Sequence, residues 1–302
     1  MKLPMIPCVV TLLSRVPRSS SFYISAPSSL TITATTTTKT TTTSSRLYSS
    51  PSSSSESMTT ITKSDGPEIP PVPSTSKRLF MVRHGEVINP GGDRPVYYGA
   101  MDVSLSPLGE QEAIVAADYL KQFKLQHVAA SPLSRAIFGA NEVLKRQTKD
   151  GTDDGGDSDD TELSELKIYD GFKELDRGSW CGKTKEEIGS DKMTKFDACD
   201  ESVTPEGGES YPALKRRVLE ARDELLDITD CGQASAVVSH LQVTRSMLSD
   251  ALDIPTDQMY RFKIATASIA CVDYNVETGE QVVHFQNFKP DAGLEKSKDG
   301  AN

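Results

Sequence analysis

Two short apolar segments of the sequence each end on residues suited to phosphate chemistry. "LFMVRHGEV" at residues 79–87 carries Arg83 and His84 directly after its apolar run, and "SAVVSH" at residues 235–240 ends on His240. Imidazole, with an ordinary pKa of about 6.5, is a neutral nitrogen nucleophile at physiological pH, and a planar guanidinium binds phosphoryl oxygens in pairs. Because ligands of open α/β sheets bind beyond the carboxyl ends of the strands, we expect the two histidines to meet around one phosphate.

The segments around these residues alternate between predicted strands and predicted helices. Short apolar runs predict buried strands, and apolar residues three and four positions apart predict helices that cover them. Ser106 followed by Pro107 is typical of a helix start. The predicted strands are 78–83, 127–131, 166–170, 235–239, 268–275 and 281–285, and the helices open at Ser106 and cover 133–144, 209–228 and 243–251. This alternation predicts a three-layer α/β/α sandwich with a mainly parallel central sheet.

The charge balance limits the classes of partner. The chain holds 33 Lys and Arg against 43 Asp and Glu, a net charge of −10, and six of the basic residues lie in residues 1–75. An acidic domain of this kind argues against nucleic acid and against an anionic membrane as partners. The five cysteines form no CxxC pair, which gives no sign of a disulfide framework or a zinc knuckle. An anionic substrate would therefore need a local cluster of positive charge.

The two ends of the chain differ in composition from residues 76–290, which we expect to form the folded domain. Residues 1–75 are rich in Ser and Thr and poor in acids, which is typical of an organelle transit peptide followed by a linker. The expected location is the plastid stroma, with the mitochondrion as the alternative. Residues 291–302 are expected to be a flexible tail, and the acidic, Gly-rich residues 149–160 a surface insertion without the spacing of a calcium loop.

Six sequence blocks occur in an order that resembles a known family. They are "RHGEVINP", "YYGAMDVSLSPLGEQEA", "SPLSRA", "KELDRGSWCG", "GGES" and "VVSH". Together they resemble the histidine phosphatase superfamily, which has the phosphoglycerate-mutase-like fold, and the resemblance covers about residues 78 to 288. The residues after the first histidine are similar to a phosphatase-type branch of that family.

This resemblance implies a role for each residue that matches a family motif. His84 would attack phosphorus and become a phosphohistidine, while Arg83 and Arg135 would bind the phosphoryl oxygens. His240 would donate a hydrogen bond to a phosphoryl oxygen in the transition state. Asn89 is expected to contact the phosphate or the rest of the substrate.

A leaving alkoxide must be protonated, so the reaction also needs a general acid. Glu174 in "KELDRGSWCG" matches the position of the family's acid, with Glu86 and Glu110 as alternatives. Glu86 could instead anchor the backbone, and a carboxylate such as that of Glu110 is favoured in the first turn of a helix by the dipole alone. Trp180 is expected in the core or in the pocket wall.

The sequence departs from the family pattern after the second histidine, where Leu241 and Gln242 stand in place of a common glycine. A bulky residue there should narrow the pocket or change which backbone amides face the phosphate. The predicted function is a metal-independent phosphomonoesterase, without a cofactor, that acts on a small phosphorylated metabolite. The alternatives are a bisphosphoglycerate-dependent phosphoglycerate mutase and a catalytically weak phospho-ligand binding protein. The oligomeric state is not predicted.

Overall fold

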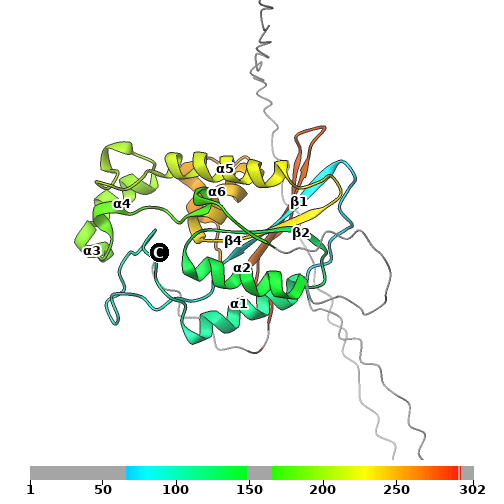
Figure 1. The fold of residues 1–302 in the computed structure, drawn as a ribbon. Coiled ribbons are helices and arrows are strands. Elements are labelled where there is room, and N and C mark those ends of the chain that lie inside the picture. Colours follow the sequence, from blue (N-terminus) through cyan, green and yellow to red (C-terminus); the bar gives the residue numbers. More distant parts are fainter. Residues whose placement is uncertain (1–65, 148–164, 292, 294–302) are drawn as a thin grey trace, which may run out of the picture. The chain divides into compact units, whose positions relative to one another are not determined.

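The centre of the computed structural model, which describes residues 66–147, 165–291 and 293, is a six-stranded sheet (Figure 1). Its strands are β1 (Ser76–Arg83), β2 (Leu125–Ala130), β3 (Leu166–Ile168), β4 (Ala234–Ser239), β5 (Ile269–Asn275) and β6 (Gln281–Phe288). They lie in the order β3-β2-β4-β1-β5-β6. The pairs β3–β2, β2–β4 and β4–β1 are parallel, and β5 is antiparallel to both of its neighbours. The prediction of a mainly parallel sheet is confirmed.

Strand β1 lies inside the sheet and is buried on both of its faces. Leu79 and Met81 join the apolar cluster on one face, and Phe80 and Val82 join the cluster on the other. Successive side chains of a strand point to opposite faces, so a strand covered on both sides needs a continuous apolar run. This requirement explains why "LFMV" does not alternate with polar residues.

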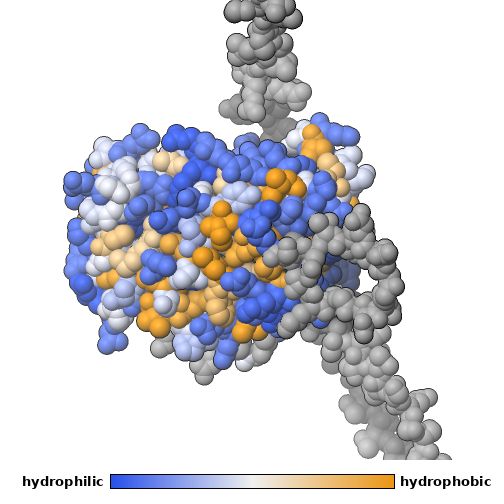
Figure 2. Space-filling model, in the orientation of Figure 1, coloured by the Kyte–Doolittle hydropathy of each residue, from blue (hydrophilic) through white to orange (hydrophobic). Residues whose placement is uncertain are grey.

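Helices cover both faces of the sheet, as predicted. Helices α1 (Pro107–Leu120) and α2 (Ser134–Gln147) pack on one face, and α5 (Tyr211–Asp227) and α6 (Leu241–Ala251) pack on the other (Figure 1). Ser106 caps α1 by accepting a hydrogen bond from the amide of Gly109, as the sequence indicated. The outward surface of α5 is largely hydrophilic (Figure 2).

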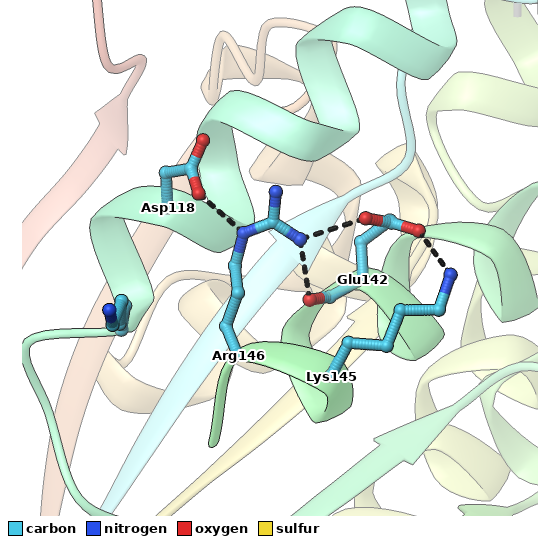
Figure 3. Close-up of a pocket in the computed structure, with 5 residues that line it drawn as sticks. Asp118, Glu142, Lys145 and Arg146 are labelled. Atoms are coloured by element: carbon cyan, nitrogen blue, oxygen red, sulfur yellow. Dashed lines mark hydrogen bonds and ion pairs between the residues drawn. The ribbon is translucent and has the colours of Figure 1, made fainter. Parts of the chain in front are cut away.

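Helices α1 and α2 are joined on their outer side by ion pairs (Figure 3). The guanidinium of Arg146 pairs with the carboxylates of Asp118 and Glu142, and Lys145 also pairs with Glu142. These groups line a hollow that is open to solvent, where ion pairs contribute little to stability and mainly keep the surface charged. We assign this network a structural role.

The segment between β3 and α5 consists of short elements that the sequence did not predict. They are η2 (Asp170–Phe172), η3 (Gly178–Trp180), α3 (Lys185–Ile188), α4 (Ser190–Asp197) and η4 (Glu201–Val203), and a further 3₁₀ turn, η5 (Thr256–Arg261), precedes β5. Trp180 is buried in the cluster beside α5, as expected. No helix among the described residues is long and apolar enough to cross a bilayer. The acidic residues 149–160 lie outside the described residues.

The topological switch point of the sheet lies between the adjacent parallel strands β1 and β4. Helix α1, which follows β1, packs on one face, and helix α6, which follows β4, packs on the opposite face. The two segments of the chain therefore diverge beyond the adjacent carboxyl ends of β1 and β4. Such a switch point opens a crevice in which ligands of α/β proteins bind. Arg83 and Ser239 are register partners at these ends, which places His84 beside His240.

Candidate active site

His84 and His240 meet at the carboxyl ends of β1 and β4. The amide of His84 donates to the carbonyl of Ser239 over 3.0 Å, which continues the ladder between the two strands. The two imidazole rings have centroids 5.1 Å apart and planes inclined by 61°. Both side chains are buried. The pairing of histidines inferred from two separate sequence segments is therefore present in the structure.

One ring nitrogen of His84, Nε2, has its lone pair available. Its Nδ1 lies 2.7 Å from the carbonyl oxygen of Gly85, which can only accept, so Nδ1 carries the hydrogen. Its Nε2 is buried and has no hydrogen-bond partner among the described residues. Burial, and then the positive charges of Arg135 and Arg83, hold the pKa of His84 well below its usual value. The imidazole is therefore neutral, with the Nε2 lone pair available for attack.

A close contact between backbones fixes the loop that carries His84. A Cβ on Gly85 would lie 2.0 Å from the carbonyl oxygen of Gly109, and a Cβ on Gly109 would lie 1.9 Å from that of Glu86. Only glycine permits this approach of the loop to the first turn of α1. The Glu86 carboxylate accepts from the Ser106 hydroxyl at 2.8 Å, and the Glu86 amide donates to Glu112 at 2.8 Å. Glu86 thus anchors the loop, which is the structural alternative to a role as general acid that the sequence left open.

His240 is held by a residue that sequence reasoning missed. Its Nε2 lies 2.7 Å from Oγ of Ser131, the residue that follows β2, while its Nδ1 is buried without a partner among the described residues. Burial, followed by the charge of Arg135, lowers the pKa of His240. Ser131 is the first residue of "SPLSRA". Because β2 is parallel to β4, its place at the end of a neighbouring strand was the signal that could have identified it.

Two buried arginines complete the cage around the histidines. Arg135, at the start of α2, is 1% exposed and donates to the carbonyls of Gly99 and Met101, each over 2.8 Å. Arg83 donates to the carbonyl of Ile264 over 2.6 Å. Both positive charges contribute to lowering the pKa of each histidine, so both guanidiniums lie close to the two rings. Backbone carbonyls orient these groups and leave their positive charge directed at the site.

Glu174 is buried beside this cage. One carboxylate oxygen accepts from the amide of Leu175 at 2.8 Å, and the other lies 3.4 Å from the amide of Gln242 in the first turn of α6. Burial lowers the pKa of Arg135, and the nearby charge of Glu174 opposes that effect. The alternative acid Glu110 is exposed on α1. Of the three candidate acids, Glu174 is the one that is buried among the catalytic candidates.

The side chain of Asn89 organises its own loop. Its Oδ1 accepts from the amides of Gly91 and Val96 at 2.9 and 3.1 Å, and its amide nitrogen donates to the carbonyl of Val96 at 3.1 Å. One N–H of the side chain remains for another acceptor. A contact between Asn89 and the substrate therefore stays a prediction. Leu241, expected to narrow the pocket, lies 8% exposed in the core cluster beside α5.

Other potential ligand groups lie next to the cage. A cavity of about 230 Å³ is lined by Ala100, Asp170, Lys173, Glu174, Asp176, Gly207, Gly208, Glu209 and Arg217. It adjoins the candidate acid and mixes both signs of charge. Within residues 66–147 and 165–291, no group of three or more His, Cys, Asp and Glu side chains is arranged to hold a metal ion.

The chain is similar to proteins of known family. A family model described as histidine phosphatase superfamily (branch 1) matches residues 79–287. A bifunctional protein of Mycobacterium tuberculosis is 28% identical over 211 residues, which cover 69% of this chain and 53% of that protein. The chain thus spans about half the length of the first curated relatives it matches. A glucosyl-3-phosphoglycerate phosphatase of Mycolicibacterium vanbaalenii is 29% identical over 192 residues, which cover 60% of this chain and 76% of that protein.

A solved structure shares the fold. The native structure of a mycobacterial glucosyl-3-phosphoglycerate phosphatase superposes with a TM-score of 0.57 at 20% identity, and the match covers 70% of this chain and 99% of that one. At this identity the comparison shows a common architecture.

Proposed function

The chain belongs to the histidine phosphatase superfamily, and from that premise we propose that it is a metal-independent phosphomonoesterase that forms a phosphohistidine on His84. The observation that carries the proposal is the bare, buried Nε2 of His84 opposite His240, within reach of two guanidinium charges. The proposed substrate is a small phosphorylated metabolite. A cation bound by the two histidines is disfavoured, because Arg83 and Arg135 would repel it.

In the first step, Nε2 of His84 attacks phosphorus, a P–N bond forms, and the P–O bond to the ester oxygen breaks. Arg83 and Arg135 neutralise the phosphoryl oxygens in a cage that excludes water, where fixed charges act strongly. Glu174 donates a proton to the departing alkoxide. In the second step, Glu174 removes a proton from water, the water oxygen attacks phosphorus, and the P–N bond breaks to release phosphate and neutral His84.

His240 needs a hydrogen on Nδ1 if it is to donate to a phosphoryl oxygen. Ser131 can favour this tautomer, because its hydroxyl can donate to Nε2 of His240 while it accepts from the amide of Leu133 at 3.3 Å. With Nε2 acting as acceptor, the hydrogen of the neutral ring stays on Nδ1, the atom that has no partner among the residues the structure describes. Ser131 is thus a positioning residue for the proposed reaction.

The proposal is tested by phosphate release from 4-nitrophenyl phosphate and from a panel of sugar phosphates, phosphoglycerates and nucleotides. We expect turnover that EDTA does not inhibit and that His84→Ala abolishes. Turnover lost in EDTA and restored by a divalent metal would contradict metal independence. The panel also separates the alternatives. Isomerisation of 3-phosphoglycerate in bisphosphoglycerate that outpaces phosphate release would indicate a mutase, and tight vanadate binding without turnover would indicate a binding protein.

A further inference from the structure

Two further arginines, Arg177 and Arg245, lie beside the phosphate cage and form no ion pair with a carboxylate of the described residues. We propose that they form a second anion-binding site, which takes a carboxylate or a second phosphate of the same substrate molecule. The inference rests on the proposed function, since it places the two ends of one substrate in adjacent sites. It narrows the substrate to small phosphate esters that carry another acidic group.

Arg245 lies on α6, next to the guanidinium of Arg83. Its Nε donates to the carbonyl of Phe262 at 2.9 Å and its Nη2 to that of Tyr260 at 3.2 Å. Arg83 donates to the carbonyl of Ile264, two residues further along the same segment. Burial lowers the pKa of Arg245; Tyr211 opposes this shift, the positive charge of Arg83 adds to it, and the carboxylates of Glu174 and Asp197 oppose it. Both guanidiniums are thus held by carbonyls of residues 260–264, and a bound anion would add a charge partner for both.

Arg177 is more deeply buried, at 3% exposure. Its guanidinium lies 4.7 Å from the ring centre of Tyr97, and its Nη1 has no hydrogen-bond partner among the described residues. A Cβ on Gly99 would lie 2.7 Å from Cγ of Arg177, and the carbonyl of Gly99 accepts from Arg135. Arg177 thus packs against the same residue that orients a phosphate-binding arginine. A buried cationic donor that is left unused costs free energy unless a ligand satisfies it.

Aromatic rings connect the two arginines. The guanidinium of Arg177 also lies 5.6 Å from the ring centre of Phe196, and that ring is 4.7 Å from the ring of Tyr211. The hydroxyl of Tyr211 donates to Asp197 at 3.4 Å, and Tyr211 lies within electrostatic range of both arginines. Asp197 and Glu174 are the acids near this group. Burial raises the pKa of Asp197, and the charge of Arg177 opposes the rise. Three guanidiniums, those of Arg177, Arg245 and Arg83, against the carboxylates of Asp197 and Glu174 leave the group positive.

Other buried arginines in the described residues show that this arrangement is unusual for the protein. Arg222 stacks on a tyrosine ring in the same way as Arg177, but it forms ion pairs with Asp223 and Asp250. Arg217 is paired with Glu209. Structural arginines in this fold thus have carboxylate partners, whereas Arg177 and Arg245 form no such ion pair with the described residues.

The test uses the full chain and two pairs of substrates matched in carbon skeleton. 3-Phosphoglycerate is compared with glycerol 3-phosphate, and fructose 1,6-bisphosphate with fructose 6-phosphate. We expect the wild type to prefer the member with the extra acid in at least one pair by about tenfold or more in kcat/KM, the scale of one charge-assisted hydrogen bond. The pair that shows the preference identifies the second group as carboxylate or phosphate.

In Arg245→Gln, and separately in Arg177→Gln, that preference should fall about tenfold, because the extra acid loses its partner. Arg222→Gln is the matched control and should keep the wild-type preference. Arg245 is partly exposed, so its variant remains informative if Arg177→Gln does not fold.

A wild type without preference in either pair overturns the second site, as does a preference that survives in Arg245→Gln. The failure of this inference is distinct from failure of the proposed function. An enzyme that hydrolyses 4-nitrophenyl phosphate through His84 but shows no preference lacks only the second site. A protein that hydrolyses no ester refutes the function itself.

Discussion

Replacing Gly85 by alanine should disable the nucleophile without unfolding the domain. The new Cβ would lie 2.0 Å from the Gly109 carbonyl oxygen, where ordinary contact begins at 3.4 Å, so the loop and α1 must separate by about 1.4 Å. A displacement of about 1 Å at a reacting atom costs on the order of 100-fold in rate. Overpacking of this kind costs about 1–3 kcal/mol of stability. Domains of this size have about 5–15 kcal/mol, so unfolding cannot account for a 100-fold loss.

The assay measures kcat with 4-nitrophenyl phosphate together with a denaturant unfolding curve. Gly109→Ala approaches the same contact from the other side, with its Cβ 1.9 Å from the Glu86 carbonyl oxygen, and should cause a similar loss. Gly279→Ala is the control, because its φ of +73° adds strain of about 1–2 kcal/mol while its Cβ meets nothing within 4 Å. If both loop variants fold and turn over within about threefold of the wild type, this contact does not position His84.

Three further outcomes follow from the site. The pKa values of His84 and His240 lie below those in the unfolded chain, so their contribution to stability is complete above about pH 6.5 and is lost as pH falls, by up to about 1.4 kcal/mol per pH unit for each ring. When urea unfolding is measured at several pH values in this range, the unfolding free energy of His84→Gln should depend less steeply on pH than that of the wild type. Ser131→Ala should lower kcat about tenfold through the lost tautomer control of His240, and Ser131→Thr should recover most of it. Glu112→Gln, which weakens the contacts of this carboxylate with Lys289, Thr266 and the Glu86 amide, should lower the unfolding free energy by about 2 kcal/mol in denaturant titration.

The strands and long helices could be predicted because their signals are local. An apolar run such as 78–83 needs cover on both faces, and β1 begins only two residues earlier than predicted. The short helices α3 and α4 escaped prediction because they have 4 and 8 residues, too few for a periodic apolar stripe. Their join at Gly189, with φ of 97°, is a backbone feature that many loops share.

The site could be predicted only where one residue type at a strand end carried the signal. His84 and His240 stood out because each ends an apolar run, and the structure brings them together. Ser131 did not, since its role depends on a partner 109 positions away. Arg177 and Arg245 were missed for a related reason. An arginine in a sequence is ordinarily a surface charge, and only three-dimensional packing shows that these two form no carboxylate ion pair with the described residues.

The most direct test of the account is to locate the phosphoryl group on the trapped enzyme. Acid-free quenching during turnover of a phosphate ester, followed by mass spectrometry and phosphorus NMR, identifies both the residue and the ring nitrogen. Because Nδ1 of His84 donates to the Gly85 carbonyl while Nε2 has no hydrogen-bond partner in the described part of the chain, we expect phosphate on Nε2 of His84 alone. Phosphate on Nδ1, on His240 or on no histidine during turnover would contradict the mechanism.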